Sequence, residues 1–155
     1  MESPQPLQLH LHDLAATARL ARQLAARLRV GDLVALDGPL GSGKTSFVRA
    51  LVTACGGEPA LVASPSYGLL HHYEADPPLV HIDAYRLRDS AELDGLGLDE
   101  IVDESVTCVE WAVRMVGLAQ RFARAWRCTW DHHPAGGRVI ELHGPEPLTL
   151  EGLHG

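Results

Sequence analysis

Hydrophobic and polar residues alternate with two different periods along this chain, so both strands and helices are expected. Residues 7 to 11 place leucine at every second position, which is typical of a short, half-buried strand. From residue 14 to 28 apolar side chains recur at steps of three and four, which predicts an amphipathic helix. Asp13 is well placed to cap the start of this helix, and Gly31 its end.

Three further segments predict buried strands, and the first of them is a continuous apolar run, as expected for a strand that is covered on both faces. They span residues 33–37, 79–83 and 106–110. A helix is predicted soon after the first of them, and residues 90–104 predict two short acidic helices broken at Gly95 and Gly97. Another strand is expected over 67–73, and alternating segments on both sides of Gly136-Gly137 predict a hairpin at one edge of the sheet. The pattern indicates an α/β protein with a mixed, mainly parallel central sheet.

Length and composition narrow the function classes. A chain of 155 residues fits one domain, residues 1–155, and no apolar run is long enough to cross a bilayer. The formal net charge of −7 argues against tight nucleic-acid binding by the chain alone. The three cysteines are widely spaced and the first residues do not resemble a secretion signal, so we expect a cytoplasmic protein without disulfides or a zinc site.

Lysine occurs once in this sequence, against twelve arginines, and its position is informative. Lys44 stands in a segment that matches the phosphate-binding pattern G-x-x-x-x-G-K-[ST], between a predicted strand and a predicted helix. Glycines there let backbone N–H groups turn inward at the positive end of a helix, where phosphate oxygens bind. The lysine supplies a point charge for the β- and γ-phosphates, and the Thr45 hydroxyl can bind Mg²⁺. The segment is Gly38-Pro39-Leu40-Gly41-Ser42-Gly43-Lys44-Thr45.

Two acidic residues stand where predicted strands end, Asp83 and Glu110. Ligands of open α/β sheets collect at the carboxyl ends of the strands, so both carboxylates are expected beside the phosphate loop. One of them would hold Mg²⁺, directly or through water, and the other would position the attacking water. The sequence alone leaves open which carboxylate does which.

Several other residues have weaker signals. The loop that contains Ser66 lies where many nucleotide hydrolases sense the γ-phosphate, although a serine-proline turn is also an ordinary structural feature. Trp111 either lines the nucleotide pocket or packs under it. All nine histidines are expected at the surface or in loops, without zinc. Arg86 and Arg138 are candidates for an arginine that stabilises the phosphates. The first helix and residues 131–138 are candidate flanks for adenine.

Four segments together resemble one family. GPLGSGKTSFVRAL, SPSYGLLHHY, HIDAYRL and VEW, in this order and at these spacings, are similar to the TsaE family, the small ATPase of the bacterial machinery that makes threonylcarbamoyladenosine beside the tRNA anticodon. The resemblance covers residues 11 to 142. The HIDAYRL and VEW segments are far more specific than the phosphate loop.

The resemblance implies a P-loop NTPase-like, three-layer α/β/α sandwich that binds ATP on residues 38–45. It implies that Mg²⁺ is held by Thr45 and Glu110 and that Asp83 is needed for hydrolysis. Ser66 stands where the family usually has threonine, so the hydroxyl is kept. The tryptophan of the family near the nucleotide corresponds to Trp111, whereas an alanine follows it here where proline is common.

The resemblance also implies partners, because the family acts with TsaB and TsaD, and tRNA would be reached only through that complex. A P-loop kinase for a small molecule or nucleotide remains an alternative, as does a scaffold that binds ATP without hydrolysing it. A GTPase is disfavoured more strongly, because the guanine-reading N-K-x-D segment needs asparagine and the sequence has none.

Overall fold

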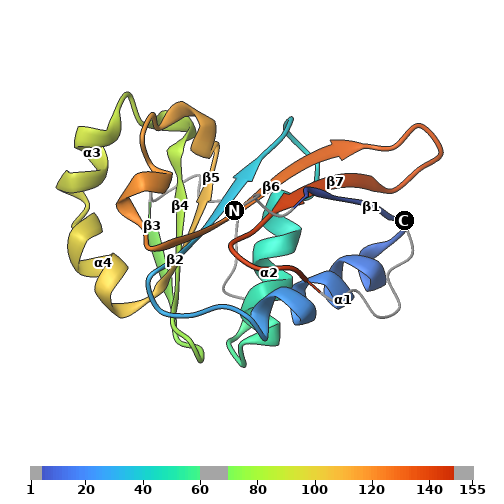
Figure 1. The fold of residues 1–155 in the computed structure, drawn as a ribbon, viewed down its shortest axis with the longest axis horizontal. Coiled ribbons are helices and arrows are strands. Elements are labelled where there is room, and N and C mark those ends of the chain that lie inside the picture. Colours follow the sequence, from blue (N-terminus) through green and yellow to red (C-terminus); the bar gives the residue numbers. More distant parts are fainter. Residues whose placement is uncertain (1–4, 60–69, 149–155) are drawn as a thin grey trace.

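The computed structural model describes residues 5–59 and 70–148, which form a seven-stranded mixed sheet with helices on both faces (Figure 1). The strand order is β1-β7-β6-β2-β5-β4-β3. The strands are β1 (Leu7–Leu11), β2 (Asp32–Asp37), β3 (Leu70–Tyr73), β4 (Leu79–Asp83), β5 (Val106–Glu110), β6 (Arg124–His132) and β7 (Arg138–His143). The α/β class and the mixed sheet are therefore confirmed.

Four adjacent strands, β6, β2, β5 and β4, form a parallel core. Antiparallel strands flank this core on both sides, β7 and β1 on one and β3 on the other. The predicted hairpin is present as β6 and β7, but it does not form the edge as expected. Its first strand pairs in parallel with β2, and the N-terminal strand β1 covers the outer side of β7.

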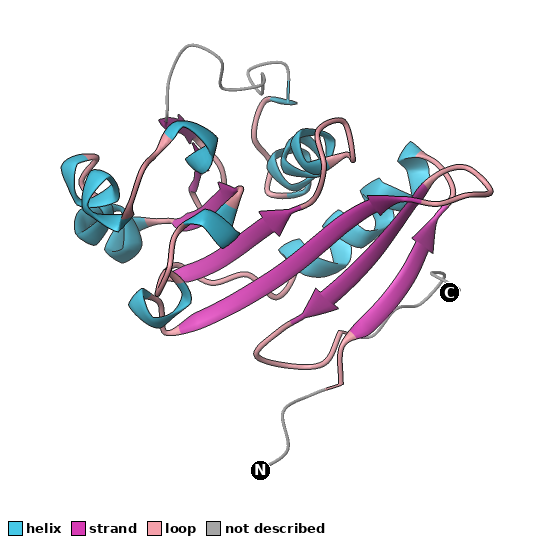
Figure 2. Cartoon of the chain, turned by 90° about the horizontal axis from the view of Figure 1, so that it is seen from above, coloured by secondary structure: helices cyan, strands magenta, loops and turns pink. Residues whose placement is uncertain are grey.

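Helices pack on the two faces of the sheet (Figure 2). The α-helices are α1 (Leu14–Ala25), α2 (Lys44–Ala54), α3 (Ser90–Gly95) and α4 (Leu98–Glu104), and the 3₁₀ turns are η2 (Ala84–Arg86), η3 (Ala112–Arg114) and η4 (Ala119–Arg121). Val34 and Leu36 of β2 join the core beneath α1 and α2, whereas Leu33 and Ala35 join the core beneath α3 and α4. A strand buried on both faces needs apolar residues throughout, which explains its continuous apolar pattern.

The end of α1 differs from the prediction. Asp13 caps the helix as expected, since its side chain accepts from the N–H of Ala16. The helix stops at Ala25 rather than near residue 28, because the backbone groups that follow form hydrogen bonds with side chains outside the helix. The carbonyl of Arg27 accepts from the Arg124 guanidinium, and the N–H of Arg29 donates to the Asp32 carboxylate. A left-handed glycine does occur at position 31, but it leads into β2 instead of closing the helix.

The predicted strand over residues 67–73 is described only from Leu70 onward, as β3. The two short helices of residues 90–104 are confirmed as α3 and α4, with the break at Leu96 and Gly97. No helix in the described part of the chain has the length and apolar character that a membrane span requires.

Candidate phosphate-binding site

The glycine-rich loop connects β2 to α2, so it opens at the carboxyl edge of the parallel core. Helix α2 begins at Lys44, and its cap, Gly43, has a φ of 109°. Gly38, with a φ of 145°, also needs a backbone conformation that other residues rarely adopt. The loop therefore places N–H groups at the positive end of an eleven-residue helix, as anion binding requires.

The loop is seated closely against β6 and β7. A Cβ added to Gly38 would lie 2.3 Å from the carbonyl oxygen of Trp130, and one added to Gly43 would lie 3.3 Å from the Trp130 ring. Arg138 of β7 donates from Nη2 to the carbonyl oxygen of Gly41 at 3.3 Å. The two glycines are thus required by close packing as well as by backbone conformation.

A cavity of about 210 Å³ opens over this loop and brings together the sequence-predicted residues of β4, β5 and α2. Its lining comprises Leu40, Gly41, Ser42, Gly43, Lys44, Thr45, Ser46, Asp83, Glu110, Trp111 and Arg138. Ser46 was not predicted, although its place directly after the motif could have indicated it. A larger cavity of about 510 Å³ lies between the β3–β4 hairpin and α4 and contains none of these residues.

Lys44 is almost fully buried, with 4% of its surface exposed. Its ammonium donates to the carbonyl oxygen of Gly38 and lies 3.7 Å from the centroid of the Trp111 ring. Burial lowers the pKa of Lys44, while the carboxylates of Glu110, Asp37 and Asp83 act in the opposite direction. The cation is therefore already surrounded by negative groups and a π-face at the bottom of the cavity.

Thr45 and Glu110 approach each other across the cavity. The hydroxyl of Thr45 lies 3.3 Å from Oε1 and 3.4 Å from Oε2 of Glu110. Two neighbouring oxygen ligands of octahedral Mg²⁺, each about 2.1 Å from the ion, lie about 3.0 Å apart. A hydroxyl and a carboxylate at nearly this separation fit the donor chemistry of a magnesium site.

Asp83 and Glu110 are register partners on the neighbouring parallel strands β4 and β5. Asp83 is half-buried, and its Oδ1 accepts from the N–H of Tyr85 at 2.9 Å. This hydrogen bond caps the 3₁₀ turn η2 and orients the carboxylate at the cavity. The two acids predicted from the strand ends therefore lie side by side.

His81 corrects the prediction that all histidines lie at the surface or in loops. None of its surface is exposed, because it is on β4, an inner strand of the sheet that pairs with β5 on one side and β3 on the other. Its Nε2 forms a hydrogen bond with Oε2 of Glu110, which compensates the loss of water around both groups. The HIDAYRL segment contained this residue, but the sequence pattern gave no indication of its partner.

Trp111 is the single non-glycine residue with a positive φ among the described residues, at 59°. Its N–H donates to the carbonyl oxygen of Leu36, and the N–H of Val113 donates to Oδ1 of Asp37 at 3.0 Å. These bonds hold the tight turn after β5 and direct the indole ring toward Lys44. The ring thus lines the cavity. Asp37 was not predicted, although its place at the end of β2 follows the same rule as Asp83.

The remaining predicted residues have different outcomes. Ser66 lies outside the described residues, so its position relative to the cavity is not part of this structure. Arg138 lines the cavity and contacts the phosphate loop, whereas Arg86 is exposed on η2 and is not among the lining residues.

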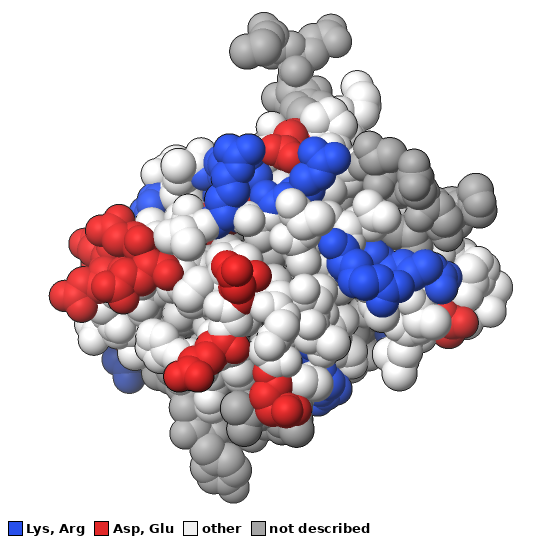
Figure 3. Space-filling model, turned by 90° about the horizontal axis from the view of Figure 1, so that it is seen from below, with Lys and Arg blue, Asp and Glu red and all other residues white. Residues whose placement is uncertain are grey.

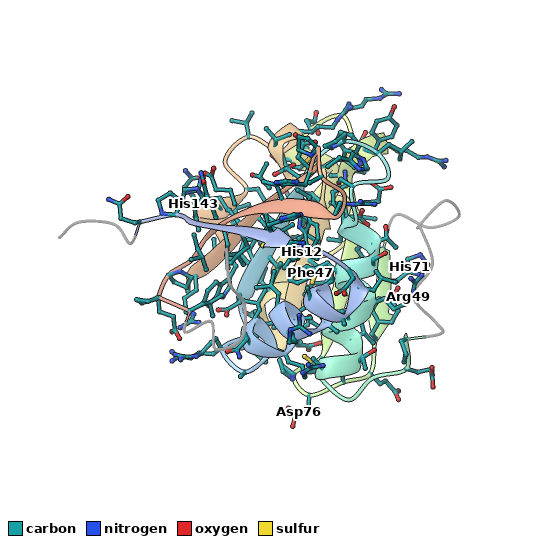
Figure 4. The ribbon with its side chains drawn as sticks, turned by 90° about the vertical axis from the view of Figure 1, so that its right-hand side faces the viewer. His12, Phe47, Arg49, His71, Asp76 and His143 are labelled. Atoms are coloured by element: carbon teal, nitrogen blue, oxygen red, sulfur yellow. The ribbon has the colours of Figure 1, made fainter. Side chains whose placement is uncertain are left out.

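A second cavity, of about 240 Å³, adjoins the first and shares Gly43, Ser46 and Arg138 with it. Its other walls come from the end of β1, the start of α1 and the β6–β7 hairpin, and they include parts of both segments proposed from sequence as flanks for adenine. Figure 4 shows His12, which lines this cavity, in the region where β1 passes α2. The two cavities are therefore neighbours that meet at the three residues they share.

The surface charge is unevenly distributed. Acidic side chains gather on the α3 and α4 side of the face in Figure 3, while arginine side chains form separate groups on the same face. Helices α3 and α4 together contain six acidic residues, Glu92, Asp94, Asp99, Glu100, Asp103 and Glu104. Arg121 pairs with Asp94 and Asp99, and the other four carboxylates leave this side of the molecule predominantly negative.

Comparison with known proteins agrees with this architecture. The structure superimposes on the crystal structure of Bacillus subtilis YdiB with a TM-score of 0.71 over 94% of this chain and 90% of that one, at 23% sequence identity. The shared fold is therefore shown, although the sequences have diverged.

Sequence comparison is more specific. A curated TsaE protein from Streptomyces coelicolor is 47% identical over 96 residues, 59% of this chain and 64% of that protein. One from Rickettsia conorii is 37% identical over 97 residues, 62% of this chain and 55% of that protein. The match thus spans less than two thirds of these two relatives. The sequence model of the family described as "Threonylcarbamoyl adenosine biosynthesis protein TsaE" matches residues 11–140. The chain therefore belongs to the TsaE family of tRNA threonylcarbamoyladenosine biosynthesis proteins.

Proposed function

We propose that this chain is a magnesium-dependent ATPase that supports threonylcarbamoyladenosine modification of tRNA next to the anticodon, acting with TsaB and TsaD. The observation that carries the proposal is the convergence of the glycine loop, Lys44, the Thr45–Glu110 pair and Asp83 on one cavity at the carboxyl edge of the sheet. This is the set of groups that phosphoryl transfer to water needs.

Each residue has a distinct role in the proposed reaction. Backbone N–H groups of residues 40–45 bind the phosphate oxygens, and Lys44 and Arg138 place positive charge beside them. Lys44 must leave the carbonyl of Gly38 to reach a β- or γ-phosphate. Thr45 and Glu110 would hold Mg²⁺, which supplies neutralising charge for the phosphates when bound.

Asp83 is proposed to orient the attacking water. It is fixed by the N–H of Tyr85, and unlike Glu110 it has no contact with the Thr45 hydroxyl, so it is the better candidate for the water. The hydroxyl of Ser66 is proposed to act with it, on the basis of the family resemblance. This division of labour is the one that the Thr45–Glu110 contact supports for the two acids that the sequence left open.

The nucleoside is proposed to occupy the second cavity. That cavity shares Gly43 and Ser46 with the phosphate site, so a ligand with its phosphates on the loop can extend into it. Leu14 also lines the cavity and is 75% exposed, which leaves an apolar surface available to a purine base. The proposed ligand is therefore ATP rather than inorganic polyphosphate.

Partners are proposed to bring tRNA to the machinery. The net charge of −7 and the acidic α3–α4 side disfavour direct tRNA binding, so tRNA is contacted only through the TsaB–TsaD complex. Residues 1–155 are proposed to work as one domain, in the cytoplasm.

The test combines binding and turnover. Calorimetry with ATP and Mg²⁺ should show binding by the wild-type chain and none by Lys44→Met. Phosphate release should be slow for the chain alone and should rise when TsaB, TsaD and tRNA are all added. The chain itself supplies the groups that bind ATP, whereas an arginine from a partner can complete the site for hydrolysis. A flat calorimetric trace for the wild type would contradict the proposal.

The same measurement separates the alternatives. A kinase would transfer labelled γ-phosphate to a small organic acceptor instead of releasing it as inorganic phosphate. A scaffold would bind ATP but would be unaffected in tRNA modification by Asp83→Asn, whereas the proposed ATPase would lose that function.

A further inference from the structure

His81 lies directly beneath the candidate magnesium site, on β4, with no exposed surface. Its Nε2 is in hydrogen-bond contact with Oε2 of Glu110, a carboxylate that is itself only 5% exposed. An ionised carboxylate accepts hydrogen bonds and cannot donate them, so the ring must carry a proton on Nε2 and donate it to Glu110. The buried ring on β4 therefore donates a hydrogen bond to a carboxylate that lines the cavity.

The rest of the ring contributes no other polar contact in the described part of the chain. Its Nδ1 is buried and has no hydrogen-bond partner among the described residues. Leu79, two residues earlier on the same face of β4, shows that an apolar side chain is what packing alone requires here. A polar ring at this place is explained by its hydrogen bond to Glu110 rather than by packing.

The hydrogen bond fixes one of the two carboxylate oxygens. With Oε2 held by His81, Oε1 of Glu110 would be the oxygen available to magnesium, although the Thr45 hydroxyl lies close to both, 3.3 Å from Oε1 and 3.4 Å from Oε2. Without this donor the Glu110 carboxylate could rotate about its last side-chain torsion. It could also turn toward the ammonium of Lys44, with which it interacts electrostatically. Groups that orient a metal ligand commonly change metal affinity about 10- to 100-fold when they are removed.

We infer that His81 is a positioning residue that holds Glu110 in the orientation that binds magnesium. The inference rests on the proposed function, because it concerns the metal that accompanies ATP. It assigns His81 no contact with the nucleotide, so its effect should be confined to metal affinity.

The experiment compares two amides of different reach. In His81→Gln the amide nitrogen can take the place of Nε2 and donate to Glu110, whereas in His81→Asn the same group is too short to reach it. Manganese, a paramagnetic substitute for magnesium, is titrated by electron paramagnetic resonance into each protein with a non-hydrolysable ATP analogue. His81→Asn should weaken manganese binding about tenfold, and His81→Gln should remain within about threefold of the wild type.

Nucleotide binding is measured in parallel with a fluorescent ATP analogue in EDTA, where all three proteins should bind equally. His81→Phe, which keeps a ring without a donor, should behave like His81→Asn. If His81→Phe fails to fold, the two amide variants still decide the question, because both bury the same polar group.

Two results would overturn the inference alone: wild-type manganese affinity in His81→Asn, or an equal loss in His81→Gln and His81→Asn, which would indicate packing. If the wild-type protein itself binds no analogue, the proposed function fails and this inference falls with it. The wild-type titration therefore distinguishes the two failures.

Discussion

Replacing Gly38 by alanine should destabilise the protein far more than replacing Gly41, although both glycines lie in the same loop and have a positive φ. At Gly38 the new Cβ would lie 2.3 Å from the carbonyl oxygen of Trp130, about 1 Å closer than an ordinary contact, and φ is 145°. At Gly41 there is no atom within 4 Å of the new Cβ, and φ is 75°, in the ordinary left-handed region.

The magnitudes follow from these two geometries. For Gly38→Ala, backbone strain of about 1–3 kcal/mol adds to an overpacking cost of about 1–3 kcal/mol, which gives a loss of about 4 kcal/mol. For Gly41→Ala, the left-handed penalty of about 1–2 kcal/mol is partly offset by the reduced freedom of the unfolded chain, which leaves about 1 kcal/mol. At about 2–4 °C per kcal/mol, the melting temperatures should fall by about 12 °C and about 3 °C.

Thermal unfolding followed by circular dichroism, without nucleotide, measures both values in matched buffers. The reasoning would be refuted if the two variants melted within about 2 °C of each other. The close contact of a Cβ at position 38 with Trp130 would then not destabilise the protein. Gly41→Ala should also still gain stability on addition of ATP and Mg²⁺, about 2.7 kcal/mol at 100 times the dissociation constant.

Three further outcomes are expected. Asp83→Asn keeps an oxygen to cap Tyr85, so it should bind ATP and Mg²⁺ normally and lose phosphate release at least 100-fold; hydrolysis at the wild-type rate would exclude its role. Leu14→Gln, at an exposed position of the second cavity, should weaken ATP binding about three- to tenfold but leave tripolyphosphate binding unchanged, as measured by calorimetry; equal losses for both ligands would place the base elsewhere. Burial raises the pKa of the Cys108 and Cys128 thiols. Above about pH 9 these thiols lose their protons in the unfolded chain but keep them in the folded chain, so the free energy of unfolding must fall as the pH rises. The slope should approach about 1.4 kcal/mol per pH unit for each thiol in urea unfolding under reducing conditions, and a double alanine variant that kept the full slope would contradict this assignment.

Much of the fold could be predicted from local pattern, because strands buried on both faces need continuous apolar residues. Residues 33–37, 79–83 and 106–110 were recognised in this way, and they are the parallel strands that lead to the cavity. The acids at their ends could be grouped before any coordinates were known, because carboxyl ends of parallel strands share one edge. Local sequence therefore located both the phosphate loop and the two carboxylates.

Contacts between distant segments could not be predicted in the same way. The segment after α1 receives a hydrogen bond from the distant Arg124 and donates one to the nearby Asp32, and the periodicity of residues 14–28 contains neither. His81 was expected at the surface because histidine is usually only partly buried, yet its hydrogen bond to Glu110 allows full burial. Both errors arise where a hydrogen bond to a polar partner outside the element outweighs a local preference.

The candidate site has two parts with different structural origins. The phosphate loop, Asp83 and Glu110 belong to the parallel core, whose strand ends are aligned by register. The wall behind the loop is formed instead by Trp130 and Arg138 of the β6–β7 hairpin, and that hairpin is covered by β1 through the pairing of Leu11 with Arg138. Because Arg138 lines both cavities, the antiparallel side of the sheet contributes to the proposed phosphate site and to the proposed nucleoside site. A glycine loop with the same local sequence but without this hairpin would still lead into the N-terminus of a helix. It would lose the surface against which Gly38 and Gly43 are packed.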